Sequence, residues 1–162
     1  MPFTPFHFGP GVAVHAAAPK YVSFLAFAAA NVFTDVEPLY FMMTGQFPLH
    51  RFLHTYVGAT FMWLAIAALF LGLRGFISAV LAALGWRQLN LTQVAAGAAL
   101  GSYSHIVLDS IIHADIRPLA PFSDANVLYQ LISLSALHVF CILAGVFGLF
   151  LLGVLHPIRR AK

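Results

Sequence analysis

Charged residues are scarce in this sequence of 162 residues: only 8% are Asp, Glu, Lys or Arg, whereas 61% are hydrophobic. An average soluble domain carries about 25% charged residues. The composition therefore argues against a soluble fold and predicts a single membrane-embedded domain over residues 1–162, with the lipid bilayer as its main partner. The eight lysines and arginines are scattered and form no basic stripe, so we expect no binding of nucleic acid.

Cysteine and the common catalytic motifs are also nearly absent. The single cysteine, Cys141, lies within an apolar run and has no second cysteine with which to form a disulfide in the chain. No G-x-S-x-G elbow, Walker loop or Rossmann glycine fingerprint occurs, which argues against a serine nucleophile and against nucleotide binding. Eight histidines remain, and they direct attention to metal chemistry.

Three apolar stretches are long enough to cross a bilayer as helices. Residues 55–73 contain no charge, and a helix of that length extends about 28 Å, close to the hydrocarbon thickness. Residues 91–112 form the second predicted span, in which Gly97 and Gly101 make a GxxxG pair that permits close helix packing. Residues 127–155 form the third and need tilt or protrusion. The predicted fold is an all-α, multispanning transmembrane helical bundle.

Shorter segments complete the predicted bundle. Residues 11–18 and 21–33 are each too short for a normal span, and we expect them to form an N-terminal helical hairpin. Residues 75–85 have apolar side chains at helical spacing between two arginines, which favours a short interfacial helix. Residues 31–47 contain polar residues and prolines and are expected to be mostly loop.

The predicted spans sort the charged residues into two sides. Because successive spans alternate in direction, one side receives the basic residues Arg74, Arg87, Arg159, Arg160 and Lys162, and this side should be cytoplasmic. The other side receives the polar residues Asp35, His50, Arg51, His54, Asp109, His113, Asp115, Arg117 and Asp124. A reactive site is therefore expected at the non-cytoplasmic side of the membrane.

Three of these polar residues share one face of the predicted helix over residues 91–112. His105, Asp109 and His113 are four residues apart, so neighbours lie about 6 Å apart along the axis. His105 and Asp109 can therefore share a metal, whereas His105 and His113, about 12 Å apart, cannot easily do so. Asp109 is thus a candidate bridge between two metals. The alternative is a packed polar stripe, but ionisable groups at membrane depth are costly and tend to be functional.

Separate parts of the chain supply further candidate ligands. His50 and His54 are also four residues apart, a spacing that suits one metal, although interfacial histidines are common too. Asp35 could bind metal, act as a base or sit in a solvated turn, and His7 could approach from the N-terminal end. The predicted metal ligands are His7, Asp35, His50, His54, His105, Asp109 and His113, around one or two divalent ions, with zinc favoured.

Two arginines on the same side are candidates for binding a phosphate. Arg51 and Arg117 could hold a phosphoryl group by paired hydrogen bonds, or they could simply contact lipid phosphates. With Asp35 as base, they complete the predicted catalytic set of Asp35, Arg51 and Arg117.

At these same residues the sequence resembles the bacterial inner-membrane metal-dependent hydrolases, described as a LexA-binding, inner membrane-associated hydrolase group. The resemblance covers nearly the whole chain and rests on MPFTPFHFGPG, ANVFTDVEPL, PLHRFLHT and SHIVLDSIIHADIRPLAPFSD. The order of His and Asp is also distantly similar to that of zinc-dependent phospholipase C, which implies His7, Asp35, His54, His105 and Asp109 as ligands. Phe52 departs from the pattern, because the wider group often has Gly there. The resemblance implies a location in the bacterial inner membrane.

These observations predict a membrane-bound metal-dependent hydrolase in which metal-activated water attacks a phosphoester or lipid-like substrate. The alternative is a non-catalytic membrane subunit, in which the same residues bind a structural metal or His138 binds a pigment.

Overall fold

The computed structural model describes residues 4–160 of the chain, with the side chains of residues 5–154, so Lys162 lies outside the described residues. Between residues 4 and 160 the chain forms helices and loops and no strand, which confirms the all-α prediction. The helices are η1 (Thr4–His7), α1 (Phe8–Ala17), α2 (Phe24–Thr34), α3 (Val36–Met43), η2 (Phe52–His54), α4 (Tyr56–Gly72), α5 (Arg74–Ala83), α6 (Leu91–Ile112) and α7 (Leu134–Arg160).

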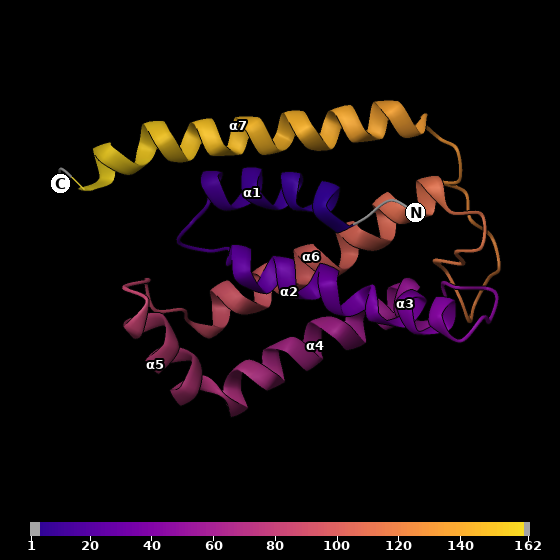
Figure 1. Cartoon of the computed structure of the whole chain (residues 1–162), viewed down its shortest axis with the longest axis horizontal. Coiled ribbons are helices and arrows are strands. Elements are labelled where there is room, and N and C mark those ends of the chain that lie inside the picture. Colours follow the sequence, from indigo (N-terminus) through magenta and orange to yellow (C-terminus); the bar gives the residue numbers. More distant parts are fainter. Residues whose placement is uncertain (1–3, 161–162) are drawn as a thin grey trace.

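The long helices are stacked in layers along the long axis of the molecule (Figure 1). The predicted N-terminal hairpin is present as α1 and α2, and α7 packs along α1. α6 packs against both α2 and α4. Where α2, α4 and α6 meet, they bury a core of Ala26, Ala30, Met62, Ile66, Phe70, Val94 and Ala98.

Two glycines allow α6 to approach α2 closely. A Cβ atom at Gly97 would lie 2.2 Å from the backbone oxygen of Ser23, and one at Gly101 would lie 2.5 Å from that of Phe27. No side chain fits at such distances, so the predicted GxxxG packing is present here between α6 and α2. The contact brings the C-terminal half of α6 against the end of α2.

The prediction of mostly loop over residues 31–47 is wrong. Helix α2 continues to Thr34, and α3 follows at Val36 after the single residue Asp35. Pro38 does not prevent α3, because it occupies the first turn of the helix, where a backbone N–H has no partner within the helix. Two short helices therefore meet at Asp35 and hold it in a defined position.

The predicted third span over residues 127–155 begins too early. Helix α7 begins at Leu134, where the Ser133 hydroxyl accepts the backbone N–H of Ala136 as a helix cap. The preceding segment is not helical, and its Gln130 N–H donates to the backbone oxygen of Ile111 at the end of α6. The Ser133 cap and the hydrogen bond to α6 therefore prevent residues 127–133 from joining the helix, although this segment is largely apolar.

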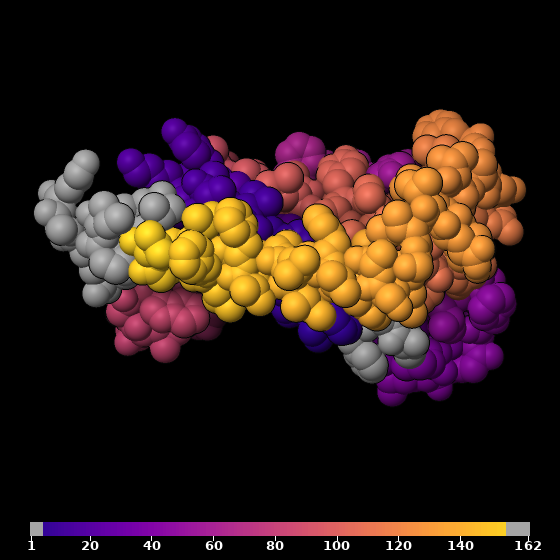
Figure 2. All heavy atoms as spheres, turned by 90° about the horizontal axis from the view of Figure 1, so that it is seen from above, coloured from indigo at the N-terminus to yellow at the C-terminus, as the bar shows by residue number. Residues whose placement is uncertain are grey.

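Among the described residues, α7 alone is a single helix long and apolar enough to cross a membrane. α4 and α5 pass the same test only as a pair, with a bend of 76° between them, and α5 matches the short helix predicted over residues 75–85. Figure 2, which looks onto α7, shows no other described segment lying over its outer side. That side carries exposed Leu143, Phe147 and Phe150. The transmembrane positions of α4 and α6 stay predictions.

Basic residues gather at one end of the bundle. The turn between α1 and α2, helix α5 and the segment before α6 lie at the end where α7 also finishes (Figure 1). These segments contain Lys20, Arg74 and Arg87, respectively. The opposite end contains η1, α3, η2 and the end of α6. The fold thus places Lys20, Arg74 and Arg87 away from the candidate ligands, whereas Arg51 and Arg117 lie at the ligand end.

Candidate metal centre

Four side chains from three parts of the chain converge at the end of the bundle opposite Lys20, Arg74 and Arg87. Asp35 comes from the α2–α3 junction, His54 from η2, and His105 and Asp109 from α6. His54 and His105 are fully buried, the Asp109 side chain is 3% exposed, and the Asp35 side chain is 29% exposed. This buried group, here called the metal centre, could hold a metal ion.

The distances within the metal centre match the spacing of ligands around one small ion. The Nε2 atoms of His54 and His105 are 3.3 Å apart, and Asp109 Oδ2 lies 3.6 and 3.2 Å from them. Asp35 Oδ1 lies 3.8 Å from His54 Nε2 and 3.2 Å from His105 Nε2. Bonds of about 2.05 Å in a tetrahedral zinc site place neighbouring ligand atoms about 3.3 Å apart. The four donor atoms therefore fit a shared divalent ion.

Hydrogen bonds orient His105 toward the centre. Asn31 donates its side-chain N–H to the backbone oxygen of Phe27 at 2.9 Å, so its Oδ1 faces His105 Nδ1 at 3.0 Å. Because Oδ1 is an acceptor, the proton of this bond resides on Nδ1, which leaves the Nε2 lone pair directed at the centre.

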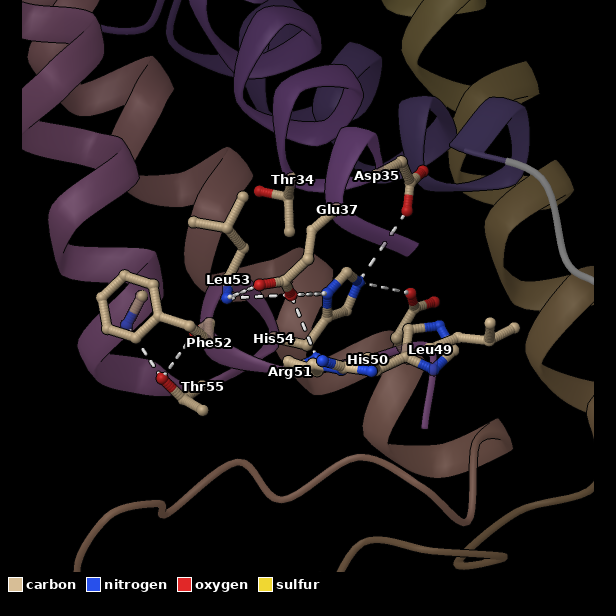
Figure 3. Close-up of polar contacts among 12 residues, drawn as sticks. Thr34, Asp35, Glu37, Leu49, His50, Arg51, Phe52, Leu53, His54 and Thr55 are labelled. Carbon is tan, nitrogen blue, oxygen red and sulfur yellow. Dashed lines mark hydrogen bonds and ion pairs between the residues drawn. The ribbon is translucent and has the colours of Figure 1, made fainter. Parts of the chain in front are cut away.

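Glu37 orients His54 from the other side of the ring. Its Oε2 atom lies 3.6 Å from His54 Nδ1, and the carboxylate also accepts the backbone N–H groups of Arg51 and Leu53 (Figure 3). Burial alone would raise the pKa of Glu37, but the nearby His54 ring and the backbone N–H groups of Leu53 and Arg51 outweigh burial and lower that pKa. Glu37 is therefore ionised near neutral pH and holds η2, with His54, in place.

Replacing Asn31 by leucine should weaken metal binding while the helix remains folded. The change removes the acceptor of His105 Nδ1, and loss of such an outer partner typically costs about 10- to 100-fold in metal affinity. Thr34→Val is the matched control, because Thr34 is equally buried on α2 and its hydroxyl donates only to the Ala30 backbone. Titration with zinc measures the metal affinity of each purified variant and of the wild type. Equal affinities of Asn31→Leu and the wild type would contradict the role of Asn31.

A second group of ligands shares Asp109. His50, Asp109 and His113 offer donor atoms within 4.8 Å of one another. The carboxylate of Asp115 accepts Nδ1–H of His50 at 2.9 Å, which leaves Nε2 of that ring available. Burial and the nearby His50 ring lower the pKa of His113 to about 4, and burial and His54 lower that of His50. Both rings are therefore neutral at pH 7, as metal binding requires.

Asp109 thus belongs to both ligand groups, in the position that its spacing from His105 and His113 predicts for a bridge. The predicted ligand His7 lies beside it: His7 Nε2 is 3.2 Å from Asp109 Oδ1, and His7 Nδ1 is 3.2 Å from His105 Nδ1. His7 therefore contacts the metal centre, although it belongs to neither ligand group.

The two predicted phosphate-binding arginines lie at the same end of the bundle but face other partners. Arg117 pairs with Asp124 at 2.8 Å, and both side chains are exposed. The Arg51 guanidinium stacks on the Phe41 ring at 3.6 Å, and its Nε–H donates to the Pro48 backbone. Their catalytic roles stay predictions. His138 belongs to neither ligand group, and its ring stacks on Phe6.

Sequence reasoning missed Asn31 as a partner of the site. One signal could have identified it, because Asn31 lies four residues before Asp35 and so one helical turn away if both are helical. The expectation of a loop over residues 31–47 removed that signal. Asp115 was placed at the correct end by sequence but without its role toward His50.

Comparisons of this chain with protein-family models, with curated proteins and with solved structures find no match.

Proposed function

We propose that this protein is a membrane-bound metal-dependent hydrolase that acts on a phosphoester, as the family resemblance in its sequence also suggests. The observation that carries the proposal is the convergence of His54, His105, Asp109 and Asp35 at distances suited to one divalent ion, with Asp109 shared with a second group. The partners on the outer sides of the rings support it: Asn31 Oδ1 accepts from His105 Nδ1, and the Glu37 carboxylate lies 3.6 Å from His54 Nδ1. Metal-binding histidines normally have such partners.

The difference in burial among the four ligands supports a catalytic rather than a structural metal. His54, His105 and Asp109 are enclosed, whereas the Asp35 side chain is 29% exposed and has the longest distance in the set, 3.8 Å to His54. Two histidines and one carboxylate are a known catalytic ligand set for zinc. We assign the enclosed three residues to metal binding and Asp35, at the exposed edge, to holding a proton as the base.

A divalent ion in this centre would lower the pKa of a bound water to about 7 and so supply a nucleophile at neutral pH. The chain's own residues position the ligands: Glu37 and Asn31 orient the two imidazoles, and the walls of α2 and α6 exclude bulk water from them. Arg51 and Arg117 are assigned to binding the phosphoryl group, which requires Arg117 to leave Asp124.

The proposed location is the bacterial inner membrane, with the metal centre at its non-cytoplasmic side. Exposed apolar side chains along α4 and α7, such as Phe61, Leu64 and Phe147, support contact with lipid. Lys20, Arg74 and Arg87 at the opposite end support a cytoplasmic position for that end. In this arrangement α4 and α6 cross the bilayer together with α7, and the polar face of α6 is shielded by α2 and α4.

Metal analysis combined with a hydrolysis assay tests the proposal. Protein purified in detergent should contain one or two divalent ions per chain, and it should hydrolyse members of a panel of phosphomonoesters and phosphodiesters. Treatment with a chelator should abolish the activity, and zinc should restore it. Metal-free protein, or hydrolysis that survives complete removal of the metal, would reject the proposal.

A further inference from the structure

A cavity of about 480 Å³ lies between α3 and α4, beside the metal centre. One wall is formed by Met62, Ala65, Ile66 and Leu69 of α4, and the only charged residue in its lining is Glu37. The volume is within the usual range of small-molecule sites. This cavity, here called the α3–α4 groove, therefore has an apolar body and one acidic end.

The acidic end of the groove adjoins the metal centre. Glu37 lines the groove and lies 3.6 Å from His54 Nδ1, while Asp35 faces the same ring from the Nε2 side (Figure 3). Val36, which also lines the groove, directly follows Asp35, the residue that forms the exposed edge of the centre. The α2–α3 junction therefore supplies neighbouring residues to the groove and to the metal centre, which lie on opposite sides of the His54 ring.

From this junction the groove extends along an uncharged helix. Met62, Ala65, Ile66 and Leu69 follow helical spacing, and they cover about 10 Å of rise along α4. Leu69 and Tyr40 on the rim are 51% and 56% exposed, so the groove opens among exposed apolar side chains. A ligand that fits the groove therefore needs an apolar part about 10 Å long and a polar part at the α2–α3 junction.

We propose that the α3–α4 groove binds the hydrocarbon chain of a lipid substrate whose phosphoester head lies at the metal centre, an inference that rests on the proposed hydrolase function. A hydrocarbon chain matches the apolar body, and a metal-bound head matches the position of the centre beside the α2–α3 junction. A helix from a second copy of the chain is the competing occupant, and the oligomeric state of the tryptophan variants tests it.

Filling the groove tests this proposal. Ala65→Trp places an indole in the wall, and Ala68→Trp is the matched control, because Ala68 is exposed on the same helix and does not line the groove. The first readout needs no catalysis: full-length protein in phosphatidylcholine vesicles is labelled by a phospholipid with a photoreactive acyl chain. Label on residues 33–41 and 62–69 is measured relative to label on exposed α7. Ala65→Trp should lower this ratio at least threefold, and Ala68→Trp should leave it unchanged.

The second readout is the dependence of hydrolysis on chain length. For phosphoesters with one head group, kcat/KM should rise by up to about fourfold for each CH2 buried in the groove. Ala65→Trp should remove this rise while retaining metal and activity on the shortest ester. If the tryptophan variant lacks metal, Ala65→Phe, which adds less volume, replaces it.

The outcomes separate this proposal from the proposed function. Selective groove labelling without hydrolysis of any phosphoester would support the groove as a chain site and reject the hydrolase. Hydrolysis that is independent of chain length, with equal labelling ratios in all variants, would support the hydrolase and overturn the groove proposal. Dimers that dissociate only in Ala65→Trp would also overturn it, because a second copy would then occupy the groove.

Discussion

Asp109→Ala is expected to remove metal from both ligand groups at once. Asp109 is the one residue shared by the metal centre and the group with His50 and His113, so its loss removes a donor from each. Metal affinity should fall by more than about 100-fold, because loss of an outer partner alone costs up to that much. Hydrolysis should fall to the rate without protein, and metal content after dialysis should fall from stoichiometric to near zero.

Asp124→Ala is the control for this change. It removes a carboxylate at the same end of the bundle, but Asp124 is exposed and pairs only with Arg117. The control should retain the metal of the wild type. Full activity and full metal content in Asp109→Ala, with an intact helical spectrum, would contradict both the shared role of Asp109 and the proposed function.

Gly97→Val is expected to cause the largest loss of stability. The new side chain would meet the Ser23 backbone oxygen, at 2.2 Å even for its Cβ, and a backbone atom cannot rotate away as a side chain can. The cost should be about 3 kcal/mol or more, at the upper end of overpacking. Because α6 carries His105 and Asp109 and α2 leads to Asp35, separation of the helices should also open the metal centre.

Thermal unfolding in detergent measures the effect of Gly97→Val, and a decrease of about 10 °C in the midpoint corresponds to the expected cost. Gly75→Val is the control, since no atom lies within 4 Å of a Cβ at Gly75 and this residue is also helical. Metal retention should fall in Gly97→Val only. Equal midpoints for the two variants would show that α6 and α2 do not pack as described.

Substitutions at different residues of the site should affect metal binding to different degrees. Asn31 and Asp115 accept hydrogen bonds from His105 and His50, and the Glu37 carboxylate pairs with His54 at 3.6 Å, so substitutions of these partners should weaken metal binding without removing it. Asp109 and Gly97 differ, because one supplies a donor to both groups and the other allows the helices to meet. A graded series of variants can therefore separate ligand loss from loss of the fold.

Some features of this protein follow from local sequence. The helix predicted over residues 91–112 has the bounds of α6, because Asn90 and Gln93 form a local capping box and no proline interrupts the segment. The four-residue spacing of His105, Asp109 and His113 places them along one helix face whatever surrounds it. The order of the helices along the chain predicts that Arg74 and Arg87 lie at the end opposite the candidate ligands, where the structure has them.

Other features depend on contacts between distant segments. The loop expected over residues 31–47 is helical, and the third span starts at Leu134, because capping groups and contacts with α6 override composition. Sequence spacing placed His54 near the correct end, but it could not show that His54 Nε2 lies 3.3 Å from His105 Nε2. Nor could it show Asn31 and Glu37 on the outer sides of these rings.

The sequence by itself determined that the protein is helical, strongly apolar and equipped with His and Asp ligands at one end, since these properties depend on composition and on the repeat of a single helix. Tertiary structure alone decided which ligands meet, which nitrogen of each ring faces inward and where an apolar groove adjoins them. These depend on glycine contacts and hydrogen bonds between residues far apart in the chain, which no local pattern encodes.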